Sequence, residues 1–81
     1  MSTNYFKDKD DVWYAEFTFD DVQFDPVYVS MFTLGPDDYE ARLSSGSKEY
    51  ITLGFVEMSS LFERIKEAHR TLLILEEQEQ C

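Results

Sequence analysis

The chain has 81 residues, 43% of them hydrophobic and 13 of them aromatic, and its 17 acidic residues against seven lysines and arginines give a formal net charge of −10. This length fits one domain, and the apolar content argues against a disordered chain. The charge opposes direct binding to nucleic acid or anionic lipid, because those partners need lysines and arginines that neutralise phosphates. We therefore predict a single small domain over residues 1–81.

Several classes of protein are excluded by simple features of the chain. It has no run of 18 apolar residues that could cross a membrane, and its first eight residues lack the apolar segment of a secretory signal. The single cysteine, Cys81, cannot form an internal disulfide, and one cysteine with one histidine cannot build a zinc finger. We expect a cytoplasmic protein that binds neither a metal nor a cofactor.

Residue patterns predict two strands in the first half of the chain. Residues 12–20 alternate strictly, with apolar side chains on one face and polar ones on the other, as in a half-buried strand. Residues 27–34 are almost continuously apolar, which suggests an interior strand covered on both faces. A loop over residues 20–26 should join them, and Gly35-Pro36-Asp37-Asp38 should form a tight turn after the second.

Two further strands are expected before residue 57. Residues 39–44 alternate again, and the serine- and glycine-rich segment 44–47 predicts the next turn. Residues 50–56 then predict a fourth strand, in which Gly54 marks a bulge or a close approach. Short connections favour pairing of consecutive strands, so we expect a four-stranded antiparallel meander.

The last third of the chain has the period of a helix. Ser60 followed by Glu63 fits a capping box, in which each side chain satisfies a backbone amide of the first turn. A helix from there to about Glu79 would present one apolar face, made of Leu61, Ile65, Ala68, Leu72 and Leu75. The predicted fold class is therefore α+β, a four-stranded antiparallel meander followed by one long C-terminal helix packed on one face (ββββα).

This order of elements is similar to that of a family of dimeric transcriptional coactivators that bind single-stranded DNA. The likeness covers the order of the elements and no motif. Such proteins bind through a basic groove rich in aromatic residues, whereas the sheet predicted here is acidic. The resemblance therefore implies architecture and not function.

Apolar side chains remain after one helix has covered one face of the sheet. Val12 and Tyr14 project away from the predicted core, and Phe62, His69 and Leu73 widen the apolar stripe of the helix. Apolar surface of this kind often marks a contact with a partner, although a small aromatic-rich domain can also leave rings exposed. We predict a homodimer with Phe62, His69 and Leu73 at its interface, and the open sheet face is the alternative. His69 is also expected at the edge of the core.

The acidic residues are concentrated in the first half of the sheet. Between Lys9 and Arg42 there is no lysine or arginine, while residues 42–70 are nearly neutral. In a meander, the acids of this half should gather at the two ends of the sheet. Like charges held together destabilise a compact protein, so the pattern needs a reason. The predicted partner-binding residues are Asp10, Asp11, Glu16, Asp20, Asp21, Asp25, Asp37, Asp38 and Glu40.

One reason for this charge is solubility, and another is a partner with a basic surface. Carboxylates ordered along strands can imitate a row of phosphates, which predicts a small inhibitor that occupies the basic site of a nucleic-acid-handling protein. An anti-restriction or anti-CRISPR role in a virus suits this size and charge. The alternative is a dimeric adaptor or structural interaction module without mimicry. We do not expect an enzyme, because a meander with one helix has little room for the desolvated pocket that a catalytic acid needs.

Overall fold

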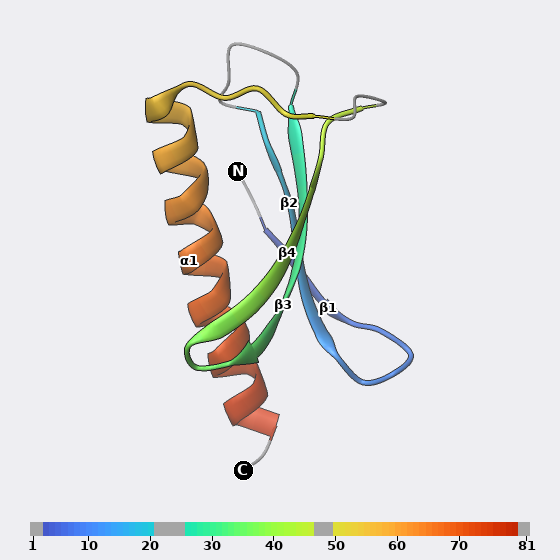
Figure 1. Ribbon diagram of the computed structural model, residues 1–81. Helices are drawn as coiled ribbons and strands as arrows, with labels where there is room; N and C mark the ends of the chain where they lie inside the picture. Colours follow the sequence, from blue (N-terminus) through green and yellow to red (C-terminus); the bar gives the residue numbers. More distant parts are fainter. Residues whose placement is uncertain (1–2, 21–25, 47–49, 80–81) are drawn as a thin grey trace.

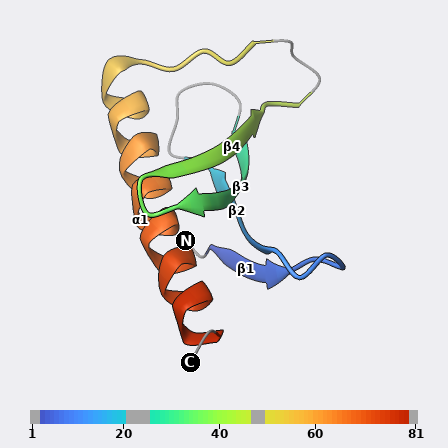
Figure 2. The ribbon, with the colours of Figure 1, turned by 60° about the horizontal axis from the view of Figure 1, so that its bottom comes forward.

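The computed structural model describes residues 3–20, 26–46 and 50–79. One antiparallel sheet carries a single long helix across one face (Figure 1), and a second view shows the strands side by side in chain order (Figure 2). The predicted ββββα fold class is thereby confirmed. The elements are β1 (Asn4–Lys7), β2 (Trp13–Phe19), β3 (Val27–Gly35), β4 (Asp38–Ser44) and α1 (Phe55–Glu79).

The core lies between α1 and the two central strands. Alternate residues of β2 and β3 point toward the helix, and the predicted apolar face of the helix covers them, apart from Leu75, which is only half-buried. Each strand therefore contributes every second side chain, as the period of an extended backbone requires. The buried hydrophobic residues are Ala15, Phe17, Phe19, Val27, Val29, Met31, Leu61, Ile65, Ala68 and Leu72.

The prediction that β3 is covered on both faces is wrong. Val29 and Met31 are buried, but Tyr28 and Leu34 on the opposite face are 50% and 57% exposed. The single helix covers only one face of the sheet, so a continuously apolar strand has one set of side chains in the core and the other set at the surface (Figure 1). We call the uncovered side the open face.

The fourth strand is not the segment that the sequence predicted. Residues 50–54 are irregular, and Phe55 and Val56 already belong to the helix. Pairing of β1 with β2 supplies the strand instead, in the register Asn4↔Glu16 to Lys7↔Trp13. The alternating apolar residues of segment 50–54 have a different use, because Ile51 and Leu53 pack against the core as the chain crosses from β4 to the helix.

The helix begins five residues before the predicted start, so the capping box at Ser60 and Glu63 is wrong. The Glu57 carboxylate accepts a hydrogen bond of 3.0 Å from the Gly54 amide, and the Gly54 carbonyl accepts one of 2.9 Å from the Met58 amide. Glu57 thus performs the glutamate half of a capping box on a glycine that precedes the first turn. Ser60 and Glu63 lie within the helix, which ends at Glu79 as expected.

The turns agree with the sequence where the structure describes them. Pro36 and Asp37 connect β3 to β4, and Gly35, the last residue of β3, has a φ of 142°, which a residue with a side chain rarely adopts. The Thr33 hydroxyl accepts a hydrogen bond from the Gly35 amide, which holds this turn. Residues 21–25 of the predicted loop and Ser47 of the next turn lie outside the described residues.

Polar contacts on both flanks of α1 orient it on the sheet. On one flank, Arg64 donates a hydrogen bond of 3.3 Å to the Thr18 carbonyl, and its guanidinium lies 4.2 Å from the centre of the Phe17 ring. On the other flank, His69 Nε2 lies 3.0 Å from both the Thr33 hydroxyl and the Gly35 carbonyl. Because a carbonyl only accepts, the Gly35 contact requires a proton on Nε2.

Candidate partner-binding surface

Four of the predicted binding residues gather at one end of the sheet. Asp10 and Asp11 belong to the connection between β1 and β2, and Asp37 and Asp38 form the turn into β4. Both connections lie at the lower end of the molecule in Figure 1, on different sides of the sheet. All four residues are exposed. Their position at one end of the sheet agrees with the grouping expected from a meander.

The first of these connections is shaped by another aspartate. The Asp8 carboxylate accepts hydrogen bonds from the amides of Asp10 at 2.9 Å and Val12 at 3.0 Å. Asp11 has a φ of 67°, in the left-handed region, and its carboxylate contacts Lys7 Nζ at 2.7 Å. Asp8 therefore builds the turn, and the turn presents Asp10 to solvent.

The end of α1 adds acids that the sequence analysis did not include in this site. Glu76, Glu77 and Glu79 lie at the C-terminal end of the helix, at the same lower end of the molecule as the two connections (Figure 1), although the β3–β4 turn meets the helix earlier, at His69. The last turn of the described helix holds no basic residue. A helix C-terminus carries a partial negative charge that favours cations, so this arrangement does not serve the stability of the helix. We call this lower end, with its turns and helix terminus, the acidic end.

Lys7 joins two parts of the acidic end. Its ammonium contacts the Asp11 carboxylate at 2.7 Å and the Glu79 carboxylate at 2.6 Å, which links β1 to the last turn of α1. The hydrogen bond to Asp11, and to a smaller extent the hydrogen bond to Glu79, raises the pKa of Lys7 above its ordinary value. Lys7 therefore links the β1–β2 connection to the end of the helix, whereas the β3–β4 turn contributes its acids separately.

The remaining predicted acids lie elsewhere. Asp20 follows β2 at the opposite end of the sheet, and Glu16 and Glu40 are exposed on the open face. Asp21 and Asp25 lie outside the described residues. A further acid, Glu57, belongs to the first turn of α1, at the other end of the molecule from the acidic end (Figure 1).

An aromatic row crosses the open face between its acids. Phe6 of β1 stacks on Tyr14 of β2 with ring centroids 5.8 Å apart, and Tyr14 meets Phe32 of β3 at 5.5 Å. Glu40 is the cross-strand partner of Phe32 on β4, so a carboxylate ends the row. Rings with polar groups around them are typical of protein-binding surfaces.

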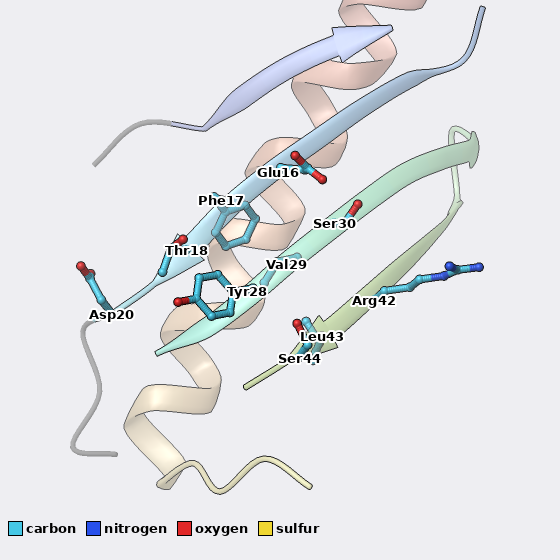
Figure 3. A pocket seen from close by; sticks show the side chains of 10 residues that line it. All are labelled: Glu16, Phe17, Thr18, Asp20, Tyr28, Val29, Ser30, Arg42, Leu43 and Ser44. Atoms are coloured by element: carbon cyan, nitrogen blue, oxygen red, sulfur yellow. The ribbon is translucent and has the colours of Figure 1, made fainter. Parts of the chain in front are cut away.

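A shallow hollow of about 720 Å³ lies beside the aromatic row. Figure 3 shows its floor on β2, β3 and β4, with Tyr28 at one end and Glu16 at the other. The Arg42 side chain extends away from Glu16, outward past the free edge of β4. Seven of the ten residues that line the hollow carry a hydroxyl or charged group: Glu16, Thr18, Asp20, Tyr28, Ser30, Arg42 and Ser44.

The three residues predicted at a dimer interface have different surroundings. Phe62 is 50% exposed, with Lys66 Nζ 4.8 Å from its ring centroid, and Leu73 is half-buried. His69 is only 8% exposed and bonds within its own chain, as expected for the edge of the core. Of the three, Phe62 offers the largest free surface, and the dimer interface stays a prediction.

More exposed apolar surface lies at the start of α1. Phe55 is 86% exposed and Val56 is 74% exposed, and Tyr50 and Met58 are also open to solvent. Sequence analysis placed Tyr50 and Val56 in a strand, where they would have belonged to the sheet. The two ends of the helix therefore differ, with apolar side chains at the start and carboxylates at the end.

Comparison with known proteins does not identify this chain: no protein-family model, curated protein or solved structure matches it. Among the described residues, no helix is both long and apolar enough to span a membrane. The same part of the chain contains no cluster of three or more side chains that could hold a metal ion. The open face and the acidic end are therefore the candidate binding surfaces of this protein.

Proposed function

We propose that this protein is a small acidic inhibitor that occupies the basic site of a nucleic-acid-handling protein. The observation that carries the proposal is the acidic end, where two turns and a helix terminus place carboxylates at the same end of the molecule. The helix acids support it most directly, because Glu76, Glu77 and Glu79 occupy positions at which a helix favours cations. A basic partner surface would stabilise this arrangement by complementary charge.

The open face supports the same proposal. Asp38 and Glu40 lie on one face of β4, two residues apart, so their carboxylates are spaced by roughly 6.8 Å along the strand. The aromatic row through Tyr14 and Phe32 supplies apolar contact area beside them. Carboxylates in a row can replace phosphates in a basic groove, and the rings would anchor the complex. An anti-restriction or anti-CRISPR role is one form that such an inhibitor takes.

Charge reversal tests this proposal. One variant changes Asp10, Asp11, Asp37 and Asp38 to lysine, and a second changes Asp20, Asp21 and Asp25. Each exposed pair contributes about 0.2–1 kcal/mol, so only several substitutions together should abolish binding. A partner captured on the wild-type protein and then purified should bind at least one variant more slowly, because steering depends on charge. Circular dichroism checks that each variant folds.

A matched control reverses two exposed helix acids outside the proposed surface, Glu63 and Glu67, and should bind normally. Duplex DNA should compete with the wild-type protein for the partner, and added salt should weaken the complex steeply. Normal binding by both sheet variants would contradict the proposal. Simultaneous binding of DNA and this protein to the partner would contradict it as well.

The exposed apolar start of α1 favours a second candidate function, a dimeric adaptor whose charge serves solubility. Phe55 and Val56 lie in the part of the chain with nearly balanced charge, away from the acidic end. Binding through this surface would depend on apolar area and would change little with salt. Salt dependence of the complex therefore separates the two functions.

A further inference from the structure

β4 is the longer of the two edge strands of the sheet. The strand order is β1-β2-β3-β4, so Asp38–Ser44 pairs with β3 on one side and with no described strand on the other. β1, at the opposite edge, has four residues against seven in β4. An uncovered edge presents unpaired backbone amides and carbonyls, which are a template for pairing with another strand.

The sequence of β4 is complementary to itself. In an antiparallel pair of two β4 strands centred on Ala41, Glu40 of each copy lies opposite Arg42 of the other. The same register places Tyr39 opposite Leu43. Cross-strand pairs share a face of the sheet, so the two ion pairs would form on the open face and the two apolar pairs on the helix side. A two-fold axis requires this kind of self-complementarity.

Arg42 and Leu43 are free to make these contacts, whereas Tyr39 also packs against the core and the His69 ring. Arg42 is exposed and forms no hydrogen bond or ion pair with the other described residues, and its guanidinium extends beyond the free edge (Figure 3). Leu43, on the helix side, remains 43% exposed because α1 packs mainly over β2 and β3. Each of these side chains would gain a partner from a second copy.

We propose that β4 pairs antiparallel with β4 of a second copy, which joins two sheets into one of eight strands. The charges favour this direction, since parallel pairing in register would bring Glu40 against Glu40 and Asp38 against Asp38. In the antiparallel register, Asp38 lies opposite Ser44. The acidic ends of the two copies then point in opposite directions, which limits repulsion between them. This inference does not depend on the proposed function.

A charge-swap series measured by sedimentation equilibrium tests the pairing. The wild-type protein should sediment at twice the chain mass of 9.6 kDa. Glu40→Arg and Arg42→Glu each place like charges opposite one another twice, so either change should weaken the dimer by roughly tenfold or more. The double variant restores opposite charges and should recover the dimer. A mixture of the two single variants should also associate, because the two arginines of one variant then lie opposite the two glutamates of the other.

Glu16→Arg is the matched control, since it makes the same change in charge on the open face of an interior strand, and it should leave the dimer intact. Circular dichroism confirms the fold of every variant. A wild-type monomer at about 100 µM, single variants that dimerise as the wild type does, or single variants that do not associate with each other would overturn the inference. If Phe62→Asp alone produced monomers, the interface would lie on the helix flank instead.

Discussion

The two faces of the sheet are made from similar residues but have different surroundings. On β3, Met31 is fully buried beneath α1, whereas its neighbour Phe32 lies on the open face in contact with Tyr14. Burial against the helix makes the first face the source of stability. The second face leaves its carboxylates exposed and its stacked rings half-buried, where both are available to a partner. The comparison shows that apolar character in a strand does not decide whether a residue folds the protein or binds another molecule.

The largest expected effect comes from truncating these two neighbours. Met31→Ala leaves a cavity in the core and should lower the free energy of unfolding by about 2–5 kcal/mol. Phe32→Ala removes one ring contact at the surface and should cost only about 0.5–1.5 kcal/mol. Urea denaturation measures both values. Equal losses of stability would show that the open face is covered by something that the single chain does not include.

Substitutions at the start of the helix should have a smaller effect on the free energy of unfolding. Glu57→Ala removes the acceptor of the Gly54 amide and should destabilise the protein by about 1 kcal/mol. Ser60→Ala should leave stability almost unchanged, because Ser60 lies within the helix and is exposed. Thermal unfolding compares the two, and Glu57→Gln, which retains an acceptor oxygen, serves as the conservative control. A larger loss for Ser60→Ala would place the start of the helix where the sequence pattern first suggested it.

The smallest effect is expected at Lys7, which links the β1 edge to the end of α1. Its pKa is raised in the folded protein, so its pairs with Asp11 and Glu79 stabilise the fold below the unfolded pKa and lose this effect as the pH rises through the folded pKa. Lys7→Met should lower the melting temperature slightly at neutral pH and low salt. The difference from the wild type should shrink in high salt and at strongly alkaline pH. A difference that persists under both conditions would indicate lost packing rather than lost charge.

Local patterns were sufficient for the parts of the fold that have a clear period. Strict alternation over residues 12–20 predicted β2 and its buried face, and the spacing of Leu61, Ile65, Ala68 and Leu72 predicted the side of the helix that enters the core. Both predictions hold because burial of one face imposes its period on the sequence. The grouping of Asp10 and Asp11 with Asp37 and Asp38 was also expected, since a meander brings the residues before its first strand to the same end as its second turn. However, the sequence placed Asp10 and Asp11 at the chain start and not in a connection between two strands.

Predictions failed where two structures have the same local pattern. Residues 50–56 alternate like a strand, but a connection that packs Ile51 and Leu53 on the core produces the same spacing. Ser60 and Glu63 match a capping box, as do many serine and glutamate pairs inside helices. β1 was missed because Asn4–Lys7 is too short to show a period, and its place beside β2 depends on pairing with a strand that already exists.

The sequence by itself determined the charge of the protein, its alternating strand, its amphipathic helix and the turn at Asp37 and Asp38. Only the tertiary structure decided that β3 has one face in solvent, that β4 has a free edge, and that Glu79 at the end of the helix meets Lys7 of β1. The physical reason is that the pattern of residues along the chain shows which side chains of an element are apolar. Whether those side chains are exposed depends on how many other elements are present to cover them. One helix covers one face of four strands, and this limit leaves the open face and the edge of β4 for other molecules.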